Sequence, residues 1–443
     1  MKNNFMQQLQ YNTFEKFLIN FQCYFFYFLP LALISGPFLS DFFAIIISII
    51  FIYLTLKKKI FYYYKNSFFL VFIFWSFYII LRSLFSIDPL FSLESSLFYF
   101  RFGFFALSIW YILETNINSM KIFTFFCFLA IFILCFDAIV QFFLGYNLIG
   151  IPYNNYRVSS FFGEELVLGS YISRIFPIFI ALIYFNYDFF KKFNFIIIIL
   201  ATLVFVTTVL SAERIAIFNI CIVIAILCFF HLKYKKYLLL FLSFLILIFY
   251  TIIQSSEAHY ERLVTNTLYE QFYIPSNLDN SDKSKIYNLL LNLHIFSKVH
   301  EGHILTAYKI FLDNPLFGQG TKMFRKLCDK DRYVIYLDDV KTDSCSNHPH
   351  NTYIQLLSAI GIIGITPFVF FMFFILYQFL IVLKSAYISN IIKSRLIIYL
   401  IIGINFFPLL PSGSFFNNWL SVIYYLPIGI MLYFYYNSKI KCI

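Results

Sequence analysis

Two histidines beside a predicted helix start are the residues of this sequence best suited to accept a proton. They lie in the run HPHNTY (348–353), in which Asn351 is a good helix N-cap. His350 stands directly before that cap, where the partial positive charge of a helix N-terminus favours a neutral imidazole. A neutral histidine, with a reference pKa of about 6.5, can take the proton of a hydroxyl nucleophile near pH 7. His348 is a possible helper of this base, and a purely structural role for both histidines is the other interpretation.

Charged side chains at one depth of the predicted membrane region form a second candidate site. A charge inside a span costs about 2.5 kcal/mol or more, so such residues usually face a polar cavity. At a rise of 1.5 Å per residue, the charged residues inside predicted spans lie within roughly 12 Å of the outer membrane surface. Five cations and one anion share this layer: Arg82, Arg101, Asp137, Arg157, Arg174 and Arg214. Because a guanidinium can donate to two oxygens of one phosphate, the set predicts an anionic ligand.

Simpler interpretations of these charges stay open. Arg82 and Arg101 can snorkel to the outer surface without binding a ligand. Asp137 can be a counter-ion to one of the arginines, and Glu213 can form a local ion pair with the adjacent Arg214.

Of eight cysteines, Cys328 and Cys345 are the two placed on the external side of the membrane. An oxidising compartment permits a disulfide between them. By the chain-entropy estimate, closing this loop would stabilise the folded state by about 3 kcal/mol. We predict that bond. Zinc binding by the two cysteines with His348 and His350 is the alternative, although their spacing matches no common zinc finger. No metal or other cofactor is predicted.

The elements that position these residues are membrane-spanning helices. The 443 residues are 61% hydrophobic and 12% charged, a composition that excludes a soluble enzyme and a disordered chain. We predict an all-α, polytopic integral membrane protein with about twelve spans. These lie near 17–35, 38–56, 67–86, 96–113, 122–144, 166–187, 193–210, 214–232, 237–254, 361–383, 396–411 and 417–436.

Three regions follow from this pattern. Residues 1–254 form a membrane domain of nine spans, and 255–350 form a large loop with short helices near 285–298 and 302–312. Residues 351–443 form an interfacial helix and three closing spans.

The positions of basic residues predict the orientation. Loops on the side of the termini are rich in lysine, whereas the short loops opposite carry only Arg157 and Arg214. By the positive-inside rule the termini are cytoplasmic and the large loop is external. The net charge of +11 is therefore mostly topological, and no nucleic acid partner is predicted.

Three runs carry a family resemblance: NPLFGQG (314–320), HPHNTYIQLL (348–357) and GIIG (361–364). Together they resemble the O-antigen ligase and O-antigen polymerase superfamily. Further features that look like its pattern are the Arg157 loop, Asp137, Gln141, Gly145 and the run SAER (211–214). The resemblance covers about Asp137 to Pro411. The chain departs from the pattern at Phe218 and His303, where leucine and arginine respectively are frequent.

The resemblance implies a bacterial inner-membrane glycosyltransferase with a GT-C-like arrangement of spans and a periplasmic large loop. It implies transfer of a glycan from an undecaprenyl-diphosphate carrier, without metal, to a sugar hydroxyl on lipid A core or on a second lipid-linked repeat. His350 would be the base and His348 its helper. Arg157, Arg214 and Arg325 would hold the diphosphate, and the depth argument adds Arg101 and Arg174 to this set.

A transporter or flippase for lipid-linked oligosaccharides is the alternative function, because it also needs many spans and a basic cavity. Transporters commonly place their polar residues at mid-depth, near broken helices. In this sequence the predicted charges lie toward one surface, beside a large external loop, which favours chemistry there.

Overall fold

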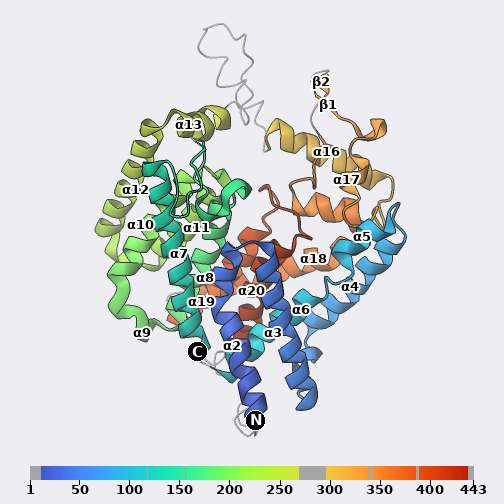
Figure 1. Cartoon of the computed structure of the whole chain (residues 1–443), viewed down its shortest axis with the longest axis horizontal. Coiled ribbons are helices and arrows are strands. Elements are labelled where there is room, and N and C mark those ends of the chain that lie inside the picture. The colour runs from blue at the N-terminus through green and yellow to red at the C-terminus, as the bar shows by residue number, and fades with distance from the viewer. Residues whose placement is uncertain are drawn as a thin grey trace.

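The computed structural model describes residues 11–116, 118–154, 156–268, 296–337, 340–341, 344–385 and 389–437. Within them the protein is a bundle of helices (Figure 1). The longer helices are α2 (Thr13–Ile34), α3 (Pro37–Lys57), α4 (Ser67–Leu84), α6 (Arg101–Thr115), α7 (Ser119–Leu144), α8 (Leu168–Phe185), α10 (Asn194–Leu210), α11 (Arg214–Phe230), α12 (Lys235–Ser255), α16 (Lys298–Leu312), α18 (Thr352–Lys384), α19 (Asn390–Asn405) and α20 (Asn418–Tyr436). The short elements are η1 (Phe61–Lys65), α5 (Pro89–Ser96), η2 (Ser160–Glu165), α9 (Tyr187–Phe190), η3 (Lys191–Phe193), η4 (Leu232–Tyr234), α13 (Glu257–Tyr260), η5 (Glu261–Thr265), α17 (Phe324–Leu327), η6 (Asp331–Tyr333), β1 (Tyr336–Leu337) and β2 (Val340–Lys341).

Many of these helices are long and apolar enough to cross a bilayer. Nine of the described helices pass on length and composition alone, and α10 makes a tenth if it continues the bent segment before it. With 17 and 16 residues, α11 and α19 are shorter than the roughly 20 residues of a typical span. The prediction of a polytopic helical membrane protein is thus confirmed. The small β1–β2 hairpin is an exception to the predicted all-α class. The count of twelve spans stays a prediction.

The N-terminal and C-terminal helices share one core. Helix α20 packs along α6, and α19 packs along α8, so helices of the predicted regions 1–254 and 351–443 pack against each other. The division of the chain into regions stays a prediction. A second, smaller core lies in the external segment, where Ala307 and Ile310 of α16 meet Phe324 and Leu327 of α17.

A break at Gly361 divides α18 into a short first helix and a long second one. The backbone there is left-handed (φ 66°), and the turn after α16 fills the break. In that turn Gln319 N donates to Ser358 O (2.8 Å) and Gly320 N donates to Ala359 O (2.8 Å). A β-carbon on Gly361 would collide with the Leu316 carbonyl, so glycine is required at this contact. The helix predicted to begin at Asn351 is therefore present as the first part of α18, fixed by the NPLFGQG turn, and its place at the membrane interface stays a prediction.

Several predicted boundaries differ from the structure. Helix α19 occupies 390–405, not 396–411, because Ser389 caps its start and Pro408 disfavours helix in the residue before it. Helix α16 starts at Lys298 because the Ser297 side chain accepts from His300 N. The predicted helix near 285–298 lies almost wholly outside the described residues.

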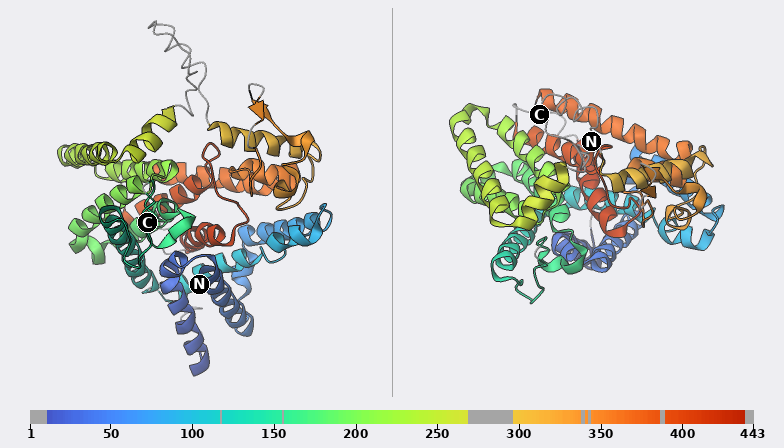
Figure 2. Two further views of the ribbon diagram at one scale, coloured as in Figure 1. Left: turned by 45° about the horizontal axis from the view of Figure 1, so that its top comes forward. Right: turned by 90° about the horizontal axis from the view of Figure 1, so that it is seen from above.

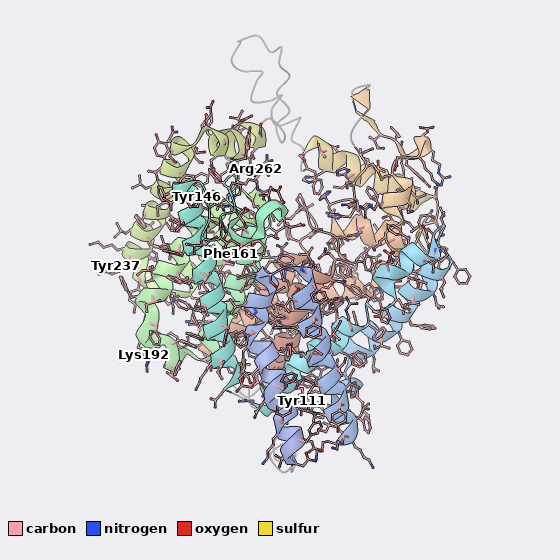
Figure 3. All side chains as sticks on the ribbon, in the orientation of Figure 1. Tyr111, Tyr146, Phe161, Lys192, Tyr237 and Arg262 are labelled. Carbon is pink, nitrogen blue, oxygen red and sulfur yellow. A yellow bond between two sulfur atoms is a disulfide. The ribbon has the colours of Figure 1, made fainter. Side chains whose placement is uncertain are left out.

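The elements that carry the candidate residues gather at one end of the molecule. Helices α13, α16 and α17 lie at the top of Figure 1, and α9 lies at the bottom. Figure 3 likewise places Arg262 and Tyr146 toward the top, whereas Lys192 and Tyr111 lie toward the bottom. Residues predicted to be external and cytoplasmic thus occupy opposite ends, and the compartment that each end faces stays a prediction.

Candidate functional site

Four histidines from two segments form a cluster, which we call the histidine cluster: His300, His303, His348 and His350. The His350 ring centroid lies 4.1 Å from that of His348, 5.2 Å from that of His300 and 5.3 Å from that of His303. Helix α16 supplies the first two residues one turn apart, and the segment before α18 supplies the other two. His350 is therefore at the centre of the cluster.

The α19–α20 loop (406–417) holds the backbone of His350 and the ring of His348 in place. Ser412 N donates to His350 O (2.8 Å), and His348 Nε2 lies 3.3 Å from Ser412 O. On the other side, Ser297 Oγ bonds His300 Nδ1 (3.0 Å). His303 is buried, and its Nδ1 has no hydrogen-bond partner in the part of the chain that the structure describes.

The polar residues after His350 attach the segment to the same loop. Asn351 caps α18 with its Oδ1 and donates from Nδ2 to Pro408 O (2.7 Å). Tyr353 OH donates to Phe406 O (2.9 Å), and Gln355 Oε1 accepts from Phe415 N (2.8 Å). The HPHNTYIQ run therefore presents its histidines while its other polar side chains hold them in place.

Burial lowers the pKa of two of these histidines, His348 and His350. Desolvation, reinforced by the neighbouring histidines, lowers the pKa of His350 to about 3. Desolvation also lowers the pKa of His348 to about 4, although the Ser412 carbonyl opposes the shift. The His350 backbone is left-handed (φ 52°), an uncommon conformation for a residue with a β-carbon. Such strain clusters at functional sites.

A second cluster surrounds the turn between α10 and α11, and we call Arg157, Arg174, Arg214 and Arg262 the arginine cluster. Arg157 Nε donates to Ser211 O (3.0 Å), and Arg262 Nε donates to Ala212 O (3.0 Å). Arg214 opens α11 directly after this turn. Two separate chain segments thus direct guanidinium groups to one short turn, and a third arginine, Arg214, directly follows that turn.

Glu213 is the carboxylate inside this cluster. Its two oxygens accept from Gly169 N (2.8 Å) and Ser170 N (2.9 Å) at the start of α8, and Arg157 NH2 lies 3.3 Å from Oε1. Burial raises the pKa of Glu213, although Arg157 opposes this. The predicted local pair of Glu213 with Arg214 is accordingly replaced by a bridge to Arg157 and a cap on α8. Arg157 bridges this carboxylate, and the charge of the nearby Arg174 also acts on it.

Asp137 positions the loop that carries Arg157. It accepts hydrogen bonds from Ser160 Oγ, from Asn147 Nδ2 (3.2 Å) and from Leu148 N (2.8 Å). These partners are neutral, so the interpretation of Asp137 as an arginine counter-ion is replaced by that of a loop anchor.

The α19 end and the loop after it connect the two clusters. Arg174, buried in α8, donates from Nε to Asn405 Oδ1 (3.1 Å), and the loop holding His350 begins at the next residue. Phe162, in the Arg157 loop, packs against Trp419 at the start of α20 (6.4 Å between ring centroids). Both views in Figure 2 show the yellow-green segment of α13 and η5 and the yellow start of α16 facing each other across a gap. Both clusters thus belong to one end of the molecule.

Three predicted arginines have other surroundings. Arg101 forms a two-pronged pair with Asp41 (3.0 Å for each prong), and Arg82 Nε donates to Gly318 O (2.8 Å). Arg325 is exposed on α17, which Figure 1 shows across the molecule from α11. The structure does not bring these three residues to the arginine cluster.

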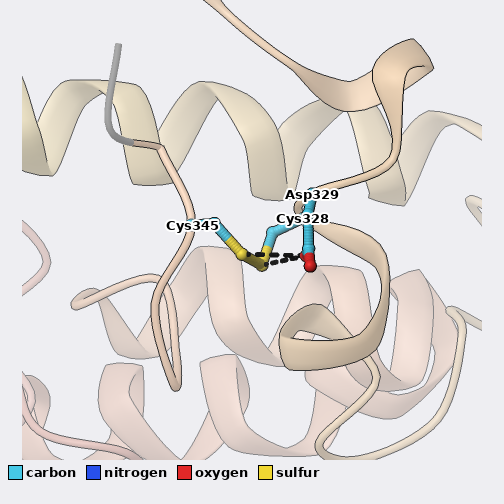
Figure 4. A group of neighbouring side chains, drawn as sticks. All are labelled: Cys328, Asp329 and Cys345. Atoms are coloured by element: carbon cyan, nitrogen blue, oxygen red, sulfur yellow. Dashed lines mark hydrogen bonds between the residues drawn. A yellow bond between two sulfur atoms is a disulfide. The ribbon is translucent and has the colours of Figure 1, made fainter.

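Cys328 and Cys345 form a disulfide with Cα atoms 5.0 Å apart, beside Asp329 (Figure 4). In the described chain, this trio is the one group of three or more metal-type side chains whose donor atoms all lie within 4.8 Å of one another. Because the sulfurs are joined to each other, they are not thiolate ligands, and the two-cysteine, two-histidine zinc set is not assembled.

Three residues of the two clusters were not predicted from the sequence: His300, His303 and Arg262. The spacing of His300 and His303, one helical turn apart, was an available signal. Arg262 gave no such signal, because it lies in a polar stretch taken as loop.

No protein-family model matches the chain, and no curated protein matches it. The fold is that of a polytopic helical membrane protein. Its candidate site consists of an arginine cluster and a histidine cluster, which the end of α19 and the following loop connect. The O-antigen ligase and polymerase resemblance stays a prediction.

Proposed function

We propose that this protein is a glycosyltransferase of the bacterial inner membrane, acting at the periplasmic surface. It would move a glycan from an undecaprenyl-diphosphate carrier to a sugar hydroxyl on lipid A core or on a second lipid-linked repeat. The observation that carries the proposal is the attachment of His350 and Arg174 to the two ends of one short segment, Asn405–Ser412. A base and a cationic site at one end of the molecule are the parts that this reaction needs.

In the proposed reaction, His350 takes the proton of the acceptor hydroxyl. The hydroxyl oxygen then bonds to the anomeric carbon, and the bond from that carbon to the diphosphate breaks. The electron pair leaves with the diphosphate. Its negative charge would raise the basicity of the low-pKa His350, since an anion nearby favours imidazolium.

The arginine cluster would bind the leaving group. Arg157, Arg174 and Arg214, with Arg262 added, exceed the charge of Glu213, so the cluster favours a multiply charged anion. Pre-positioned cations stabilise charge that develops in the transition state. We leave Arg101 out of this site because Asp41 occupies its guanidinium, and Arg325 because it is exposed on the far side.

The test is His350→Ala, with His350→Gly as a second variant that suits the left-handed backbone. We expect glycan transfer by membranes to fall at least about 100-fold in both variants, with accumulation of the lipid-linked donor. His231→Ala, at the far end of α11, is the matched control and should retain transfer.

A transporter would keep most of its flux without a base. Normal surface glycan in His350→Gly cells, with the protein present at wild-type level, would therefore reject the transferase and support the alternative of a lipid-linked oligosaccharide transporter.

A further inference from the structure

An exposed apolar surface covers the corner between α4 and α5 and continues onto the NPLFGQG turn, and we call it the corner–turn surface. Its members are large apolar side chains that are exposed in the part of the chain that the structure describes: Leu84, Phe85, Ile87, Leu90, Leu316 and Phe317. Phe85 and Leu90 are 79% and 80% exposed. A soluble protein rarely exposes a large apolar patch unless another apolar partner covers it.

Direct contacts join the corner and the turn into one unit. Arg82 Nε, near the end of α4, donates to Gly318 O in the turn (2.8 Å). A β-carbon on Gly320 would lie 2.6 Å from the Ser86 β-carbon, so the turn packs closely on the corner. The two apolar parts therefore share one position relative to the membrane.

An exposed stripe on α4 runs into this surface. Its residues follow one another at intervals of three, four and three, which places them on one face of the helix: Phe74, Phe77, Leu81 and Leu84. Helix α4 is among those long and apolar enough to cross a bilayer, so its exposed apolar face contacts lipid tails. The corner continues this lipid-facing stripe past the end of the helix.

A second stripe reaches the surface from α18. One face of this helix is exposed at intervals of four, four, three and four residues: Ile362, Thr366, Phe370, Phe373 and Tyr377. At the break, Ile362 N donates to Pro315 O (2.9 Å) and Ile363 N donates to Leu316 O (3.2 Å), so this stripe meets the turn. Two candidate spans thus direct their exposed faces to one surface, and lipid is the partner that both faces share.

Ion pairs form the boundary of the surface toward α17. Lys322 Nζ lies 2.8 Å from Glu94 Oε2, and Lys326 Nζ lies 3.3 Å from Asp88 Oδ2. Both ammonium groups also lie over the Phe91 ring, at 5.1 and 4.8 Å from its centroid. They connect the α5 segment to the α17 segment, its neighbour in Figure 1. Apolar side chains beside long charged ones are typical of the bilayer interface.

The length of α4 indicates the depth of the corner. Its 18 residues rise about 27 Å at 1.5 Å per residue, close to the roughly 30 Å hydrocarbon thickness of a bilayer. The helix begins at Ser67, on the side predicted to be cytoplasmic. Its last residue, Leu84, therefore reaches the hydrocarbon boundary on the side of the histidine cluster.

We propose that the corner–turn surface is embedded among lipid acyl chains at this boundary and that it holds the histidine cluster at the height of the lipid head groups. Gln319 N in the turn donates to Ser358 O, and His350 precedes Ser358 by eight residues. At 1.5 Å per residue, the His350 backbone is thus kept within about 12 Å of the embedded turn. The placement is independent of the proposed reaction.

Spin labels test the placement of the surface. Phe74, Phe85, Leu90 or Lys326 is replaced by cysteine in a full chain whose unpaired cysteines are serine, and the labelled protein is studied in nanodiscs of phosphatidylethanolamine and phosphatidylglycerol. Oxygen enters hydrocarbon, whereas a polar nickel chelate stays in water. The ratio of oxygen to nickel collisions at positions 85 and 90 should exceed that at position 326 about tenfold, equivalent to about 1.4 kcal/mol of partition free energy. Position 74, within the α4 stripe, should give the highest ratio.

Lys326→Cys is the matched control, because it adjoins the same corner but belongs to the charged boundary. Equal ratios at positions 85, 90 and 326 would place the surface in water and overturn the proposal. Low collision rates with both reagents at positions 85 and 90 would show that protein, such as a second copy of the chain, covers the surface, and would also overturn it.

Fluorescence quenching tests the height of the histidine cluster. Val299, exposed beside His300 on α16, is replaced by cysteine and labelled with a fluorophore in the same nanodiscs. A nitroxide on the lipid head group should quench this label severalfold more than a nitroxide near the end of an acyl chain, and the order should reverse for a label at position 74. Absence of quenching at position 299 by either lipid would place the cluster beyond the membrane surface and reject its proposed height.

Discussion

The left-handed backbone of His350 costs a residue with a β-carbon about 1–2 kcal/mol, and several contacts hold it there. Its carbonyl accepts from Ser412 N, and Asn351 begins α18 at the next position. The ring is thereby kept among three other imidazoles, in a place where protonation is unfavourable. These contacts explain how His350 lies directly before a helix cap while its ring takes no part in the capping.

The lowered pKa values of His348 and His350 predict a loss of stability in acid. Below about pH 6.5 the unfolded chain binds protons at both positions, whereas the folded protein does not until about pH 4 and pH 3. Stability should therefore fall as the pH decreases through this window and level off below it. Because the rings are partly exposed, we expect no more than about 1 kcal/mol per pH unit.

Thermal unfolding in detergent from pH 7.5 to pH 3.5 measures this effect, with His348→Gln as the comparison. The variant lacks one proton-binding group, so its melting temperature should decline less steeply than that of the wild type. Parallel curves for the two proteins would contradict the low pKa of His348.

Whether a contact of the site could be predicted depends on how many residues separate its partners in the sequence. The HPHN run identifies His348 and His350 locally, because the cap and the helical spacing follow within a few residues. Arg101 and Asp41 are 60 residues apart, and Arg82 and Gly318 are 236 apart. Such partners become visible only in the tertiary structure, so these arginines were included in a ligand site that they do not join.

At the scale of elements, the contact between the NPLFGQG turn and the break in α18 positions the histidine cluster. Gly361 opens the break, and Gly318, also at positive φ, packs against the Ala359–Ile360 backbone. Trp75 and Tyr78 of α4 donate to Gly364 O (2.6 Å) and Ile360 O (2.8 Å). This turn is the reason that α16, with its two histidines, lies over the start of α18.

Gly361→Ala should disrupt this contact. The added β-carbon would meet the Leu316 carbonyl in a conformation that alanine rarely adopts, so we expect a loss of at least about 2 kcal/mol and a strong decrease in transfer. Gly403→Ala is the control, because nothing lies near a β-carbon there and the site is helical. It should be neutral or stabilise by up to about 1 kcal/mol. Equal melting temperatures for the two variants would show that the break tolerates a side chain.

The pattern of hydrophobic runs predicted the helices well, since each predicted span overlaps a helix. It did not predict the end of α19, because apolar residues continue past Asn405 into the loop that contacts His350. That loop, Phe406–Asn417, carries few polar side chains and bonds mostly through its backbone. The residue types of this loop therefore gave no indication that it contacts the site.

For the whole molecule, the proposed chemistry requires the end with the two clusters to face the periplasm. The disulfide Cys328–Cys345 lies at that end, and disulfides persist in oxidising compartments. Lys192 lies at the opposite end (Figure 3), as the positive-inside rule predicts for a cytoplasmic loop.

A membrane-impermeant maleimide tests this orientation in intact spheroplasts. In a chain whose unpaired cysteines are replaced by serine, Lys326→Cys on α17 should be labelled fully, because its side chain is exposed at the predicted outer end. Lys192→Cys, equally exposed, should react only after the membrane is permeabilised. The opposite pattern would put the histidine cluster in the reducing cytoplasm, where the disulfide would not persist and where no periplasmic acceptor could reach His350. Orientation therefore decides whether the histidine and arginine clusters can act on one pair of lipid-linked substrates, as the proposed function requires.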